Sequence, residues 1–255
     1  MRASPRFVRT ATLWTVGVMA SSCQWAFPLD TFDSQPAGVC PASGPWLCDD
    51  FEHGLDATKW SIMNQKGGTL GLTSQAQDAV HVHRGNASLH VSFQLPSATP
   101  EVDLVHAGLI PSSLYARVFV YVPASLPPIA SPFIVTMQDA APYQGVQLST
   151  VASGTAASLR MTDWGNTPSY NATSQSNFPV EQWVCLEWNV DSTTGSARVW
   201  VNGTEVTDLR ASGLVTPPYG WLKLGQIGNQ IAATGSFDLW MDDFYADTAP
   251  VGCSK

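Results

Sequence analysis

A hairpin pattern between residues 183 and 207 constrains the fold of this chain more than any other feature. Trp183-Val-Cys-Leu-Glu-Trp-Asn-Val190 has an apolar residue at every second position from Val184, which is the period of a strand that buries one face. Turn-forming residues follow at 191–195. After the apolar run 197–201, Asn202-Gly203 is the sequence most typical of a two-residue hairpin turn. Three consecutive antiparallel strands are therefore predicted.

The rest of the chain from residue 46 onward repeats the strand pattern and has no amphipathic helical period. Charged residues make up only 13% of the chain, whereas its 20 glycines and 18 prolines supply the turns that many short strands need. We predict strands at residues 46–52, 79–83, 88–93, 115–122, 133–138, 146–151, 158–162, 183–190, 197–201, 204–207, 221–227 and 237–245. Because a single sheet of this size would expose too much apolar surface, the predicted fold class is all-β, a two-sheet antiparallel β-sandwich forming one domain over residues 46–255.

Residues 1–22 have the order of an export signal. Three arginines in the first nine residues precede an uncharged stretch, residues 10–22, that is too short to cross a ~30 Å hydrocarbon layer as a stable helix. Ala20-Ser-Ser-Cys23 resembles the cleavage box of bacterial lipoproteins, although such boxes usually have leucine where Ala20 stands. Two outcomes remain open: attachment of a lipid to Cys23, or cleavage nearby by an ordinary signal peptidase.

Export and charge together limit the expected location and partners. We expect the protein in the cell envelope, as an outer-membrane lipoprotein, or outside the cell, with residues 23–45 as a flexible tether. Contact with a membrane is then expected only through an N-terminal lipid. The chain has 12 Lys and Arg against 20 Asp and Glu, a net charge of −8, so it repels phosphate backbones and nucleic acid is not an expected partner.

Four cysteines remain once Cys23 is assigned to the processing site, and an oxidising compartment lets them pair. Three pairings are possible among Cys40, Cys48, Cys185 and Cys253. We favour Cys40 with Cys48, because they bracket a short turn-rich loop, and Cys185 with Cys253, which would tie the C-terminus to a strand.

Two sets of motifs carry a family resemblance. Asp50-Phe-Glu-His-Gly54, Arg84-Gly-Asn-Ala-Ser-Leu-His-Val91 and Leu239-Trp-Met-Asp-Asp-Phe244 are similar to motifs of jelly-roll carbohydrate-binding modules. The stretch 183–202 resembles strands of concanavalin A-like and laminin G-like sandwiches, an architecture that some polysaccharide lyases share. Both resemblances imply a concanavalin A-like jelly roll.

The first resemblance also implies a structural calcium ion. In such modules an early glutamate and an aspartate of the last strand hold calcium, which corresponds to Glu52 and Asp243 here, with Asp50 or Asp242 nearby and carbonyl oxygens from the loop at Arg84-Gly85. The alternative is that these carboxylates are solvated or accept hydrogen bonds from turn amides.

Saccharide binding needs aromatic faces for stacking and a few polar groups for hydroxyls. The polar segment 162–170 offers both, so Trp164 and Tyr170 are the expected stacking residues, with Asp163 and Asn166 as polar contacts. Neighbouring segments are expected to add Tyr143, Gln147 and Arg160. We therefore favour binding of a polysaccharide or a cell-surface glycan without catalysis.

Two enzymatic functions and one further binding function are the alternatives to this prediction. A lyase is conceivable with Tyr143 as base and Gln138, Arg117 and Arg160 as the groups that neutralise a uronate. A glycoside hydrolase needs paired carboxyls, and the nearest match, Glu187-Trp-Asn-Val-Asp191, puts its second acid in a turn. The further function is protein binding by an adhesion module.

Overall fold

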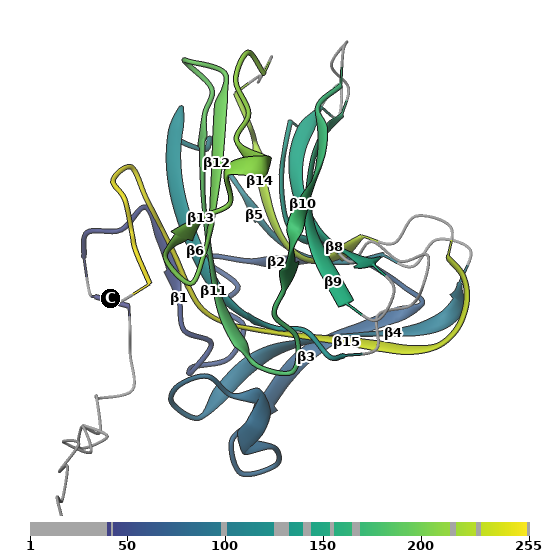
Figure 1. The fold of residues 1–255 in the computed structure, drawn as a ribbon. Coiled ribbons are helices and arrows are strands. Elements are labelled where there is room, and N and C mark those ends of the chain that lie inside the picture. Colours follow the sequence, from purple (N-terminus) through teal and green to yellow (C-terminus); the bar gives the residue numbers. More distant parts are fainter. Residues whose placement is uncertain are drawn as a thin grey trace, which may run out of the picture. The chain divides into compact units, whose positions relative to one another are not determined.

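The computed structural model describes residues 40–41, 43–97, 101–124, 133–139, 144–153, 156–164, 169–214, 218–227 and 231–253. Two antiparallel sheets stack face to face in this domain (Figure 1). Alternate residues of nearly every strand meet between the sheets in one apolar core, which includes Phe93, Leu104, Val118 and Leu186. The predicted all-β sandwich is confirmed.

The first sheet has eight strands. Along its path lie β13 (Thr204–Glu205), β12 (Ser196–Val201), β11 (Trp183–Asp191), β6 (Ser113–Tyr121), β15 (Ile231–Asp247), β4 (Ala87–Ser97) and β3 (Gly68–Ser74), and β1 (Leu47–Asp49) pairs with β15. The predicted meander is confirmed, since β11 pairs with β12 and β12 with β13.

The second sheet has seven strands. Their order is β10 (Asn171–Phe178), β9 (Ala156–Trp164), β8 (Gly145–Ser153), β7 (Phe133–Gln138), β14 (Trp221–Ile227), β5 (Glu101–Ala107) and β2 (Ser61–Lys66). Chain-sequential neighbours form hairpins from β7 to β10, whereas β14 arrives from far along the sequence and separates β7 from β5.

The strand predictions were wrong in five places. Residues 79–83 do not form a strand: Ala79–His81 is the short 3-10 helix η1, which Asp78 caps by accepting a hydrogen bond from the Val80 amide. Four strands were missed, namely β2, β3, β5 and β10. Of these, β3 and β10 are rich in Gly, Ser, Thr or Asn, which weakens a signal based on alternating apolar residues.

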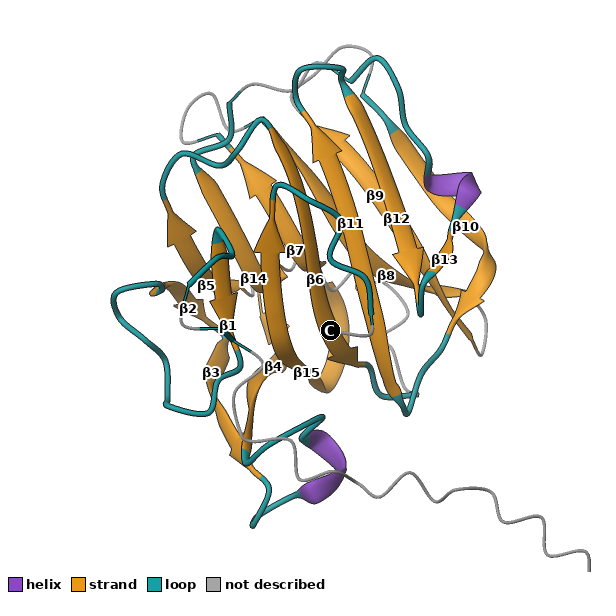
Figure 2. Cartoon of the chain, turned by 90° about the vertical axis from the view of Figure 1, so that its left-hand side faces the viewer, coloured by secondary structure: helices purple, strands orange, loops and turns teal. Residues whose placement is uncertain are grey.

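The two flanks of the sandwich are closed differently. At one flank the 3-10 helix η2 (Thr207–Leu209) lies beside β10 and β12, with Leu209 fully buried and Asp208 accepting a hydrogen bond from the Gln175 amide (Figure 2). At the other flank lie the edge strands β2 and β3, where Ile62 is 46% and Leu72 is 37% exposed. The apolar core therefore reaches solvent at the β2–β3 flank.

Both predicted disulfides are confirmed. Cys40 is bonded to Cys48, and Cys185 of β11 is bonded to Cys253 near the C-terminus. The expected signal segment, Cys23 and most of the expected tether lie outside the described residues. In the part of the chain that is described, no helix has the length and apolarity needed to span a membrane.

The two disulfides should differ in their contribution to stability. Cys185–Cys253 closes a separation of 68 residues and Cys40–Cys48 a separation of 8. In the chain-entropy model, replacing the first pair by alanine lowers the free energy of unfolding by about 4 kcal/mol and replacing the second by about 2.5 kcal/mol. Urea denaturation of both double variants measures this difference, and equal losses would show that loop length does not set the order.

Candidate functional site

The outer face of the seven-stranded sheet, turned away from the core, carries a concentration of polar and aromatic side chains. On the inner face, Leu222, Leu224, Val135 and Leu148 belong to the core. Because successive side chains of a strand point to opposite faces, the residues between them point outward. Cross-strand pairing then fixes which of these outward residues are neighbours.

One row of neighbours across the outer face contains two tryptophans. Trp164 of β9 pairs with Gly145 of β8, Gly145 with Gln138 of β7, and Gln138 with Trp221 of β14. A Cβ added to Gly145 would lie 2.7 Å from the Trp164 ring, so glycine lets this ring lie across β8. Three strand spacings, about 14 Å, separate the backbones of the two tryptophans, with the Gln138 amide between them.

A second row, beside the first, is polar. It joins Thr162, Gln147, Thr136 and Lys223 on β9, β8, β7 and β14. Lys223 is only 5% exposed, and its ammonium lies 5.5 Å from the centroid of the Trp221 ring. The lysine and a tryptophan of the first row therefore form one patch.

The Lys223 charge is balanced by a buried partner on the next strand. Its Nζ lies 3.1 Å from Oδ2 of Asp103 in β5, a carboxylate that is fully buried. Burying either charge alone is costly, so each ion stabilises the other in place. The pair fixes an ammonium group at the middle of the sheet.

A third row lies on the other side of the polar row. Arg160 of β9 pairs with Ser149 of β8, and Thr173 of β10 pairs with Arg160. Ser149 is fully buried, and its hydroxyl has no hydrogen-bond partner among the residues that the structure describes. A second cationic side chain thus shares the outer face with Lys223.

The structure brings together three of the seven predicted binding residues. Trp164, Gln147 and Arg160 all lie on the outer face. Asp163 points to the core side with Val146 and is 1% exposed. Tyr170 packs against the core, and its hydroxyl donates to the Arg210 carbonyl oxygen at 3.4 Å. The other two predicted residues, Tyr143 and Asn166, lie outside the described residues.

Sequence reasoning missed Trp221, Lys223 and Asp103. A signal for the first two was present, because Trp221-Leu-Lys-Leu-Gly225 alternates apolar residues with a tryptophan and a lysine. Nothing in the sequence pairs Lys223 with Asp103, since 120 residues separate them and the strand that carries Asp103 was not predicted.

The structure places several residues of the two enzyme hypotheses away from the outer face of the seven-stranded sheet. The prediction that Arg117 joins Arg160 was wrong, because Arg117 is buried on β6 of the other sheet and donates to the Gly252 carbonyl oxygen. Glu187 also belongs to that sheet and accepts hydrogen bonds from the amides of Val251 and Gly252. Asp191 accepts from the amides of Thr193 and Thr194, which is the expected turn role.

The predicted calcium ligands lie where the 83–87 loop meets the two terminal strands. Glu52 accepts hydrogen bonds from the Asn86 amide at 2.7 Å and the Ala87 amide at 3.1 Å, and Gly85 leaves the space that its carboxylate occupies. Asp243 has a left-handed backbone, with φ of 49°, and contacts Nδ1 of His83 at 2.7 Å.

The carboxylate oxygens of Glu52, Asp242 and Asp243 are hard ligands of the kind that calcium binds, although N–H groups of the protein already contact them. Burial, and next the charge of Asp243, raise the pKa of Asp242 to about 9, against the effect of three amides that donate to it. A cation nearby would relieve this repulsion. Among the described residues, however, no three His, Cys, Asp or Glu side chains are arranged to hold a metal. Calcium stays a prediction.

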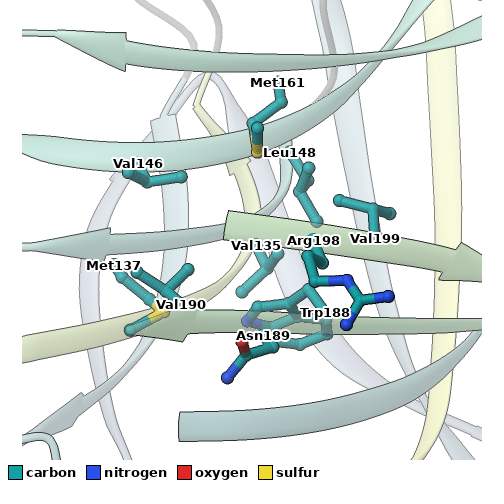
Figure 3. A pocket seen from close by; sticks show the side chains of 10 residues that line it. All are labelled: Val135, Met137, Val146, Leu148, Met161, Trp188, Asn189, Val190, Arg198 and Val199. Atoms are coloured by element: carbon teal, nitrogen blue, oxygen red, sulfur yellow. The ribbon is translucent and has the colours of Figure 1, made fainter. Parts of the chain in front are cut away.

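A cavity among the described residues lies elsewhere, between the two sheets. Its volume of about 10 Å³ has room for one water molecule, and its walls come from both sheets, with Trp188 and Met161 among the residues that line it (Figure 3). Within the described part of the chain, the buried Trp188 indole N–H has no hydrogen-bond partner. This cavity is a small packing defect of the core and is too small for a sugar.

Comparison with known proteins matches the chain to one family. The family model for the core domain of Cip1-like, polysaccharide lyase-like proteins matches residues 50–243. No curated protein sequence matches the chain.

Solved structures share the fold. The cellulose-induced protein Cip1 superposes with a TM-score of 0.61 at 18% identity, covering 82% of this chain and all of Cip1. A carbohydrate esterase of the Shiga toxin-encoding bacteriophage phi24B has a TM-score of 0.55 at 12% identity, covering 80% of this chain and 97% of the esterase. A sialidase has a TM-score of 0.53 at 11% identity, covering 80% of this chain and 18% of the sialidase.

The calcium prediction has a direct thermal test. An ion that binds only the folded state raises the melting temperature. We expect 1 mM CaCl₂ to raise it by several degrees over the same protein in EDTA, and the Glu52→Gln variant to lose that difference. Equal melting curves in calcium and EDTA would leave hydrogen bonding to the 83–87 loop as the role of these carboxylates.

Proposed function

The chain belongs to the Cip1-like, polysaccharide lyase-like family, and we propose that it binds a polysaccharide across the outer face of its seven-stranded sheet without cleaving it. The observation that carries this proposal is the row that holds Trp164 and Trp221 on either side of Gln138. The family assignment supports a role in carbohydrate recognition and leaves the choice between binding and cleavage to experiment.

The two tryptophans suit the apolar faces of sugar rings. Pyranose C–H groups stack on aromatic rings, and polar groups beside the rings bond the hydroxyls and so set orientation. Trp164 and Trp221 are both half-buried, which holds each ring in place and leaves part of its surface accessible. An extended glycan lying perpendicular to the strands would meet both rings, with the Gln138 side chain, which is only 6% exposed, beneath it between them.

The charges on this face favour an acidic glycan. Arg160 and the ammonium group of Lys223, which is paired with Asp103, both lie on the outer face. Ammonium and guanidinium groups form charge-assisted hydrogen bonds with carboxylates. We therefore propose uronate-containing polysaccharides, free or on a cell surface, as the ligand class.

A lyase is the second candidate, and the family description favours it. Elimination would break the bond between C4 and its glycosidic oxygen: a base removes the proton from C5, a C4–C5 double bond forms, and the leaving oxygen takes a proton. Gln138, Lys223 and Arg160 could neutralise the carboxylate. The predicted base, Tyr143, lies outside the described residues, and no histidine among the described residues lies on this face. For this reason binding without cleavage is the primary proposal.

Export to the cell envelope or the exterior accords with this ligand class. The two disulfides are typical of an oxidising compartment. We propose that the N-terminal segment directs export and that Cys23 is the site of lipid attachment, which would hold the domain near the cell surface.

The tryptophans provide the test of binding. We expect Trp164→Ala and Trp221→Ala each to weaken binding to pectate or alginate about tenfold, or ~1.4 kcal/mol, because each removes one stacking surface. Isothermal titration calorimetry measures the loss, and the phenylalanine variants should recover part of it. Trp200→Ala is the matched control, since Trp200 lies on the other sheet beneath Arg198.

Two results would change this assignment. Unchanged affinity in both alanine variants, with wild-type melting temperatures, would remove the proposed face. Release of unsaturated uronates that absorb in the ultraviolet would establish the lyase in place of the simple binder.

A further inference from the structure

One of the four sheet edges in the described part of the chain has none of the features that block pairing with another strand. β13 has two residues, and both β10 and β2 are interrupted by register shifts. β3 pairs with β4 through all seven of its residues without a shift, and it contains no charge and no proline. Exposed edges are normally blunted by charges, prolines, bulges or short length.

The edge strand β3 also borders the open flank of the sandwich. Leu70 and Leu72 pair with Val91 and Leu89 of β4, so they point to the core side of the sheet. Leu72 is nevertheless 37% exposed, and Ile62 on the neighbouring edge strand β2 is 46% exposed. Figure 2 shows β2 and β3 together at this flank, opposite η2. Among the described residues, these apolar side chains thus lie beside a row of β3 backbone groups that pair with no further strand.

The sequence of β3 indicates what covers this edge. Thr69-Leu-Gly-Leu-Thr73 reads the same in both directions about Gly71. If two copies pair antiparallel with Gly71 opposite Gly71, then Leu70 of each lies opposite Leu72 of the other and Thr69 opposite Thr73. Leucine–leucine and threonine–threonine pairs across strands are both favourable.

We propose that two copies of this chain form a dimer through antiparallel β3–β3 pairing about a two-fold axis at Gly71. The axis is perpendicular to the sheet, so both copies keep their leucines on the core side and the two eight-stranded sheets become one. In such an isologous interface the β3 edge of each copy is paired with that of the other, so no third copy can add at this edge and the assembly is a dimer. Pairing of one short strand buries less than the ~800 Å² per partner of a standard interface, so the dimer is weak.

Gly71 gives a test that depends on the proposed register. A Cβ added at Gly71 meets no atom within 4 Å, so a longer side chain fits the folded monomer. In the dimer the two residues 71 lie directly opposite, where like charges repel. We expect sedimentation equilibrium of the wild-type protein at about 0.5 mM to show a mass well above 27.4 kDa, and Gly71→Lys and Gly71→Glu each to remain monomeric.

Mixing the two charged variants distinguishes this register from other arrangements. Lysine opposite glutamate should restore association as a heterodimer in the equimolar mixture. Thr204→Lys, a charge on β13 at the opposite edge of the same sheet, is the matched control and should dimerise like the wild type. A wild-type protein that is monomeric at about 1 mM, or Gly71→Lys and Gly71→Glu variants that still form homodimers, would overturn the proposal.

Discussion

Side-chain alternation in paired strands is the constraint on which this structure depends. Each sheet must bury one face, and the two inner faces supply that burial for each other. Leu222, Leu224 and Leu104 point into the core. Because side chains alternate along a strand, Trp221 and Lys223 therefore point to the opposite face. The strand register places Gln138 and Trp164 on that same face. The candidate site is thus a consequence of how the core is packed.

The sequence was sufficient for the architecture and for part of the site. Alternation in residues 183–190 and the Asn202-Gly203 turn predicted β11, β12 and their connection, because these signals are local. The favoured disulfide pairing, one of three possible, rested on the short turn-rich loop between Cys40 and Cys48, and it is confirmed. Trp164, Gln147 and Arg160 were predicted from segments that are neighbours both in sequence and in the sheet.

The remaining residues of the site depend on long-range pairing. β14 enters between β7 and β5, which lie about a hundred residues earlier, and only this insertion brings Trp221 beside Gln138 and Lys223 beside Asp103. Tyr170 shows the opposite error, because an aromatic ring in a polar segment gives no sign that it will pack on the core. The 79–83 segment was misread for a related reason: Asp78 caps a turn there, and a side-chain cap competes with strand formation.

The proposed dimer and the proposed binding face are compatible. β3 is the edge of the eight-stranded sheet, whereas the tryptophan row belongs to the seven-stranded sheet, so pairing through β3 leaves both copies of that row outside the contact between the strands. A dimer would present two binding faces to one polymer, and a weak affinity for single sites would then give a larger avidity for a long glycan. The two proposals still rest on different residues.

Fluorine NMR of 5-fluorotryptophan-labelled protein tests the central claim most directly, with Trp→Phe variants to assign the resonances. On titration with uronate oligosaccharides, the signals of Trp164 and Trp221 should shift together and saturate, while those of Trp183 and Trp240, on the other sheet, should stay in place. Shifts confined to Trp183 and Trp240 would place the ligand on the opposite face of the sandwich and contradict the account.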